Sequence, residues 1–151
     1  MATDTKKYRE FLVAVADDVS PALESVDFAA IVDELVTWSE KQKPPLEERH
    51  NESRTTLSFA IPENDVVIWR VAPRKKDGAK VEVLPGDSAL LPIGARQSME
   101  KVLEALSPGL DLDADERFMM PLHNLAEPKA MKQFLSLLAV TLKAARSLHR
   151  A

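Results

Sequence analysis

The chain contains no cysteine and only four glycines among its 151 residues. The absence of cysteine excludes disulfides, thiol nucleophiles and thiolate metal ligands, and it favours a reducing compartment. The glycines are scattered, so the chain has neither the GxGxxG turn of dinucleotide-binding folds nor a phosphate-binding P-loop. The nucleophile elbow GxSxG is also missing. We therefore expect neither nucleotide-dependent chemistry nor catalysis by a serine nucleophile.

The chain has no apolar run of membrane-spanning length. Near the C-terminus the longest such run is Leu137–Val140, whereas a spanning helix needs about 20 residues. The apolar patch Phe11–Ala16 follows basic residues, as in a signal peptide, but Asp17 and Asp18 close it without a cleavage-like site. We therefore expect a cytoplasmic protein that does not contact a membrane.

The composition is that of a folded protein, with 45% hydrophobic and 29% charged residues. The length fits one domain, which we expect to span residues 6–151 after a flexible tail at residues 1–5. The net charge of −4 arises in residues 1–43, which carry nine acids against five bases. An acidic chain argues against strong non-specific binding to nucleic acid, because that binding requires the neutralisation of phosphates.

Hydrophobic periodicity predicts an α+β fold. Period-two alternation predicts a strand at residues 57–61, and a run rich in β-branched residues predicts another at residues 66–71. Short turns join these to a third strand at residues 80–84 in an antiparallel meander, and residues 116–120 are a candidate fourth strand. Helical spacing predicts helices at residues 6–17, 27–41, 95–106 and 128–148. The second helix begins either at Ser20-Pro21 or at Asp27, both of which are start signals. We expect a single domain with a three- to four-stranded antiparallel sheet packed against N-terminal helices and a long C-terminal helix.

The last predicted helix has an unusually wide apolar surface. One narrow polar stripe contains Lys129, Lys132, Ser136 and Lys143, and apolar residues cover much of the remainder. In the interpretation that we favour, this helix crosses the sheet and also touches the N-terminal helices. The alternative is that part of it forms a dimer interface. The sequence leaves open whether the protein is a monomer or a homodimer.

An acidic series, Asp111, Asp113 and Asp115, has the spacing of the first ligands in a calcium-binding loop. The remainder of that pattern is absent, because Glu116 replaces the glycine of the sharp turn and Leu122 replaces the closing glutamate. We interpret these acids as solvated linker residues and expect no metal and no cofactor.

The histidines offer a weak candidate for chemistry. His50 lies near Glu47 and Glu48, and a histidine between carboxylates can act as a general base or bind a small molecule. No second histidine stands at metal-ligand spacing. For His123 and Asn124, which follow the last predicted strand, we expect structural hydrogen bonds.

A basic turn between two predicted strands offers a second weak candidate. Its cationic residues are Arg74, Lys75, Lys76 and Lys80. A basic β-ribbon can contact phosphates, and the neighbouring Trp69 could stack on a base. However, side chains alternate along a strand, so Trp69 and Arg70 face opposite sides of the sheet. We expect Trp69 to lie in the core and the turn to carry the charges of an ordinary solvated hairpin.

The sequence shows no convergent set of acid, base and nucleophile. It therefore favours a small non-catalytic binding or protein-interaction domain. The alternatives are nucleic-acid binding through Arg74–Lys80 and small-molecule binding or hydrolysis near His50. The predicted order of elements carries no family signature, and a resemblance of shape would transfer neither residues nor activity.

Overall fold

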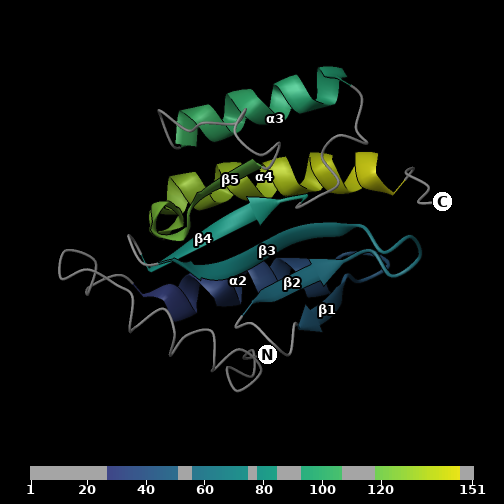
Figure 1. The fold of residues 1–151 in the computed structure, drawn as a ribbon, viewed down its shortest axis with the longest axis horizontal. Helices are drawn as coiled ribbons and strands as arrows, with labels where there is room; N and C mark the ends of the chain where they lie inside the picture. The colour runs from purple at the N-terminus through teal and green to yellow at the C-terminus, as the bar shows by residue number, and fades with distance from the viewer. Residues whose placement is uncertain (1–26, 51–55, 75–77, 85–92, 107–117, 147–151) are drawn as a thin grey trace.

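The fold is seen in a computed structural model, which describes residues 27–50, 56–74, 78–84, 93–106 and 118–146 (Figure 1). The described elements, in chain order, are α2 (Phe28–Glu40), β1 (Glu47–His50), β2 (Leu57–Ala60), β3 (Val67–Arg74), β4 (Gly78–Val83), α3 (Ile93–Leu106), β5 (Phe118–Pro121), the 3-10 helix η4 (Leu122–Ala126) and α4 (Pro128–Ala145). The predicted helix at residues 6–17 and the Ser20-Pro21 start signal lie outside the described residues.

The strands form one antiparallel sheet in the order β1-β2-β3-β4-β5. The predicted meander is confirmed as β2, β3 and β4, and the predicted fourth strand as β5. The expected strand count was too low, because β1 pairs with β2 over Glu47–His50. Periodicity did not identify β1, since its four residues are all polar and show no apolar alternation.

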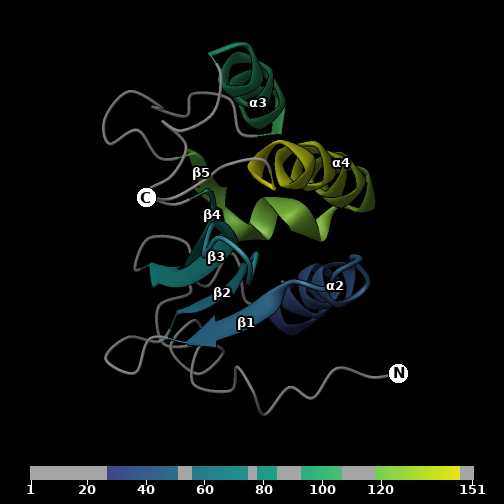
Figure 2. The same cartoon turned by 90° about the vertical axis from the view of Figure 1, so that its right-hand side faces the viewer.

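The described helices α2 and α4 lie on the same side of the sheet, and η4 lies between them (Figure 2). Helix α4 contacts β3, whereas α3 packs beside α4 and contacts β5. The expected contact of the C-terminal helix with the N-terminal helical part is made through η4, which touches both α2 and α4. The fold is therefore α+β, with α3 stacked beyond the helix that covers the sheet.

The core lies between this helical layer and the sheet. Trp69 is fully buried there, as the sequence predicts, and its ring stacks on Phe59 with centroids 5.1 Å apart. Its indole Nε1 donates to Ser39 Oγ at 2.7 Å, and the Ser39 hydroxyl donates in turn to the Leu35 carbonyl at 2.9 Å. This buried chain of hydrogen bonds joins β3 to α2 because Trp69 presents its polar edge to the helix.

Helix α2 begins after Asp27, whose carboxylate accepts a hydrogen bond from the Ala30 amide at 3.0 Å. This contact satisfies one of the amide donors that a helix N-terminus leaves without an intrahelical partner. The predicted apolar face is confirmed, since Phe28, Ile31 and Leu35 are buried. Asp27 therefore acts as the N-cap, one of the two start signals that the sequence offered.

Helix α4 buries the side chains that periodicity places toward the core, among them Met131, Phe134 and Leu138. Val140 departs from the expectation that a packing partner covers the apolar surface, because 62% of its area is exposed. Within the described part of the chain, no helix is both long enough and apolar enough to pass through a membrane.

Candidate functional site

The three residues of the predicted His50 site lie on the edge strand β1. Neighbouring side chains of a strand project to opposite faces, so Glu47 and Glu48 do not share one side of the sheet. The His50 backbone pairs with Leu57, but its side chain lies outside the described part of the structure. A site built from all three residues therefore remains a prediction.

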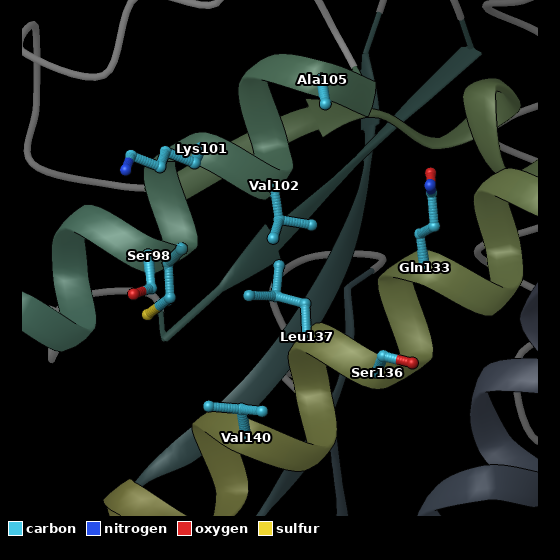
Figure 3. Close-up of a pocket in the computed structure, with 9 residues that line it drawn as sticks. Ser98, Lys101, Val102, Ala105, Gln133, Ser136, Leu137 and Val140 are labelled. Carbon is cyan, nitrogen blue, oxygen red and sulfur yellow. The ribbon is translucent and has the colours of Figure 1, made fainter.

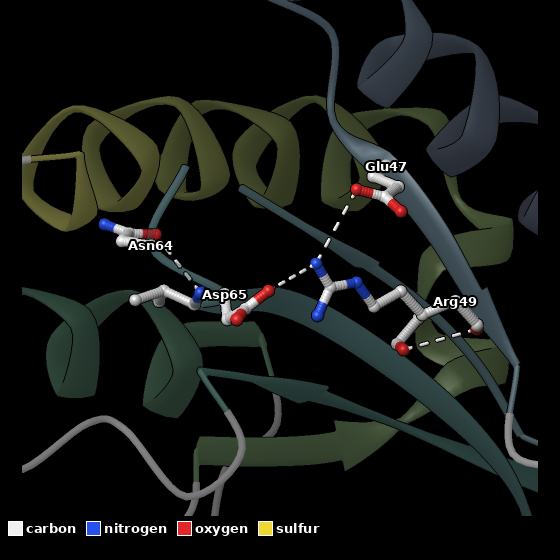
Figure 4. Close-up of polar contacts among 6 residues, drawn as sticks. Glu47, Arg49, Asn64 and Asp65 are labelled. Carbon is white, nitrogen blue, oxygen red and sulfur yellow. Dashed lines mark hydrogen bonds and ion pairs between the residues drawn. The ribbon is translucent and has the colours of Figure 1, made fainter. Parts of the chain in front are cut away.

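Glu47 instead takes part in an ion-pair network that extends to the turn between β2 and β3 (Figure 4). The Arg49 guanidinium lies 2.6 Å from Asp65 Oδ1 and 3.6 Å from Glu47 Oε2. The hydrogen bond to Asp65 raises the pKa of Arg49 above its ordinary value. The network links the turn to β1. All three side chains are partly or largely exposed, so it contributes little to the free energy of unfolding.

Within the predicted nucleic-acid site, the structure describes the side chain of Lys80 alone. Arg74 ends β3, whereas Lys75 and Lys76 lie outside the described residues. Lys80 is partly buried, and its Nζ lies 3.6 Å from Glu82 Oε1. Glu82 is itself buried and accepts two hydrogen bonds of 3.0 Å from Arg70 Nη2. Lys80 therefore belongs to a charged cluster with Arg70 and Glu82 on the sheet. Nucleic-acid binding by this hairpin stays a prediction.

Among the described residues, no group of histidine, cysteine and acidic side chains has the geometry of a metal site. The acidic series Asp111–Asp115 lies outside those residues. Asn124 makes the expected structural hydrogen bond, donating to the Leu106 carbonyl at 3.2 Å. For His123 the expectation fails at one ring nitrogen, because Nδ1 is buried without a hydrogen-bond partner.

An apolar groove lies between α3 and α4 (Figure 3). We call it the α3–α4 groove; its volume is about 450 Å³ and it is lined by Ser98, Met99, Lys101, Val102, Ala105, Gln133, Ser136, Leu137 and Val140. The two helices run antiparallel, since Ser98 lies near Val140 at one end and Ala105 near Gln133 at the other. Val102 and Leu137 point toward each other across the groove.

The groove continues into a second, more polar hollow of about 540 Å³, which shares Ala105 and Gln133 with it. His123, Glu127 and Lys129 line this polar end, where α3 ends and α4 begins. Glu127 and Lys129 are exposed, and no hydrogen bond or ion pair joins His123 to a carboxylate in the described structure. The hollow thus brings a histidine near a carboxylate without assembling an acid–base pair.

The α3–α4 groove also contains a spacing that the sequence reasoning overlooked. Ser98 and Lys101 stand in a Ser-x-x-Lys arrangement on α3, the spacing that some serine hydrolases use for nucleophile and base. Here the Ser98 hydroxyl donates to the Gly94 carbonyl at 3.1 Å, and Lys101 is exposed. A lysine acts as a base only when burial or a neighbouring charge favours loss of its proton. The pair therefore lacks the arrangement of an activated nucleophile.

The groove could not be found from the sequence. Val102, Leu137 and Val140 occupy apolar positions of amphipathic helices, and periodicity assigns such residues to a core. Only the placement of α3 beside α4 shows that Val140 is exposed there, beside the partly buried Val102 and the buried Leu137. Comparisons of the chain with protein-family models, with curated proteins and with solved structures find no significant match.

Proposed function

We propose that this protein is a non-catalytic, cytoplasmic protein-interaction domain that holds an amphipathic helix of a partner protein in the α3–α4 groove. The observation that carries the proposal is the exposure of Val140, 62% of which is accessible beside the apolar lining of the groove. An apolar side chain exposed within an apolar hollow is characteristic of a binding surface, whereas scattered exposed apolar residues are ordinary.

A helix fits this surface better than a compact small molecule does. The two antiparallel helices that form the walls carry apolar residues on successive turns, with Leu137 on α4 facing Val102 on α3 and Val140 one turn further along α4. An amphipathic helix presents apolar side chains at the same repeat, so its stripe can follow the hollow along its length. The Ser98 hydroxyl donates to the Gly94 carbonyl of its own helix and not to a base, which supports the non-catalytic part of the proposal.

The experiment uses a neutral probe, a helical peptide of about 16 residues with leucines at helical spacing and glutamine elsewhere. We expect its addition to shift the methyl NMR signals of Val102, Leu137 and Val140. Replacement of two lining residues, Ala105→Gln and Val140→Gln, should weaken binding about tenfold or more, because a valine-sized apolar contact contributes roughly 1.5–3 kcal/mol.

The matched control is Ala139→Gln. Ala139 is exposed on the same turn of α4 as Val140, but it does not line the groove. Its affinity for the peptide should equal that of the unaltered protein. Equal losses in the control and in the groove variant would contradict the proposal, as would methyl shifts confined to residues outside the groove.

A further inference from the structure

We infer that the partner helix is acidic along the flank that faces α4, an inference that rests on the proposed function. The sequence of α4 contains Lys129, Lys132 and Lys143 and no aspartate or glutamate. All three lysines are exposed. Lys129 lines the polar end of the groove, Lys132 stands one turn before Ser136, and Lys143 stands one turn beyond Val140.

These lysines are available for an external partner. No ion pair joins Lys129, Lys132 or Lys143 to another residue in the described part of the chain. Their positive stripe contrasts with the net charge of −4 of the whole chain. The opposite wall is mixed in sign, with Lys101 exposed on α3 beside Glu104. On the α4 side Glu127 accompanies Lys129 at the polar end, whereas α4 itself contains no acidic residue beside Lys132 and Lys143. The attraction for acidic groups is therefore concentrated around these two lysines.

The spacing of Lys132 and Lys143 matches a short helix. Lys132 and Lys143 are eleven positions apart on α4, a distance of about 16 Å at 1.5 Å per residue. A partner helix of about three turns spans this distance. Its apolar stripe would cover Leu137 and Val140 while carboxylates on one flank reach the lysines at both ends.

The same charges disfavour two other occupants. A second copy of this chain that docked through α4 would place its own lysines against Lys132 and Lys143, and like charges in such positions repel. A nucleic acid would satisfy the lysines but would leave Leu137 and Val140 against a polar backbone, because phosphates offer no apolar surface. An acidic amphipathic helix satisfies both the lysines and the apolar lining.

The test compares three peptides that share the leucine stripe of the neutral probe and carry glutamate, glutamine or lysine on the flanks. We expect the full chain to bind the glutamate peptide about tenfold more tightly than the lysine peptide at low salt, with a difference that shrinks as salt is added. The double variant Lys132→Gln and Lys143→Gln should weaken glutamate-peptide binding about three- to tenfold, because two exposed charge pairs each contribute modestly. Binding of the glutamine peptide should be unchanged.

The matched control removes two exposed lysines at the end of α2, Lys41→Gln and Lys43→Gln, which lie outside the groove lining. An equal loss of glutamate-peptide affinity in this control would overturn the inference, because it would show a general effect of net charge. Equal affinity for all three peptides, together with loss of binding on Val140→Gln, would overturn the acidic specificity and leave the proposed function standing.

Two further outcomes concern the occupant itself. Failure of every peptide to bind would contradict the proposed function and the inference together. Binding of duplex DNA that is lost in the Lys132 and Lys143 variant but kept in Val140→Gln would overturn both in favour of a nucleic-acid surface. A concentration-dependent dimer that Val140→Gln dissociates would instead identify a second copy as the occupant.

Discussion

At the scale of single residues, two buried hydrogen bonds run from the Trp69 indole through the Ser39 hydroxyl to the Leu35 carbonyl. We expect Ser39→Ala to lower the free energy of unfolding by about 1–3 kcal/mol, because the buried indole N–H loses its acceptor. Chemical denaturation followed by fluorescence measures this change.

Ser98→Ala is the matched control for that prediction. Ser98 also donates to the carbonyl four residues earlier in its helix, but it does so at an exposed position and accepts no buried N–H. Its removal should change the free energy of unfolding by less than about 0.5 kcal/mol. Similar losses in the two variants would mean that the helix bond, and not the indole, explains the role of Ser39.

The sequence predicts the burial of Trp69 but not its hydrogen bond. Alternation within one strand is sufficient to place an aromatic residue on the inner face. The acceptor, Ser39, lies 30 residues earlier on α2, and a polar residue on the edge of an apolar helix face carries no signal of its partner. The same limit applies to Glu82, which the sequence shows as a polar strand residue and the structure shows buried against Arg70.

At the scale of secondary-structure elements, two asparagines hold the C-terminal ends of helices. Asn64, in the turn after β2, donates to the Ala145 carbonyl at 3.0 Å and accepts from the Val66 amide at 3.1 Å. Asn124 donates to the Leu106 carbonyl at the end of α3. Carbonyls at a helix C-terminus lack intrahelical partners, so Asn64 ties the end of α4 to the turn after β2, and Asn124 ties the end of α3 to η4.

We expect Asn64→Ala to destabilise the last turn of α4 by about 1–2 kcal/mol, because one side chain loses two hydrogen bonds. Hydrogen exchange of the amides near Ala145 should accelerate, while exchange in β3 should change less. Glu63→Ala, at an exposed neighbouring position of the same turn, should leave both rates unaltered. Faster exchange throughout the sheet would show that the contact supports the whole fold instead of one helix end.

Elements were predictable where the sequence alternates cleanly and unpredictable where it does not. The apolar alternation Leu57, Phe59 marks β2, and the β-branched run of β3 marks its neighbour. Strand β1, with the sequence EERH, contains no apolar residue and therefore has no such pattern. The turn at Asp65 was equally hard to predict. Asp65 has a left-handed φ of 60°, which aspartate tolerates, so the turn lacks the glycine that usually signals this conformation.

At the scale of the whole molecule, the described elements share one core of buried residues that draws on α2, α3, α4 and the sheet. We therefore expect the chain to unfold as a single domain. Fluorescence of Trp38 on α2 and Trp69 on β3, and far-UV circular dichroism, dominated by the helices, should give coincident denaturation curves. Loss of helical signal before the fluorescence change would indicate that α3 and α4 form a separate unit.

The layered arrangement was predictable only in outline. A sheet with one apolar face requires a helical layer, and the sequence therefore predicts the α+β class and a helix on the sheet. It does not predict that α3 lies beside α4 instead of on the sheet, because both helices offer similar apolar faces. The candidate groove depends on that choice, which is why the site emerged from the structure and not from a motif.

The order of the strands across the sheet is also their order along the chain. From β1 to β4, each strand therefore meets a partner that has just preceded it, and the loops that must close are short. Such pairings cost little chain entropy, and a growing polypeptide can add them one at a time from one edge. The strand β5, paired with β4 at Val83 and Phe118, follows α3 in the chain, so the segment that forms one wall of the groove has been synthesised before the strand that completes the sheet.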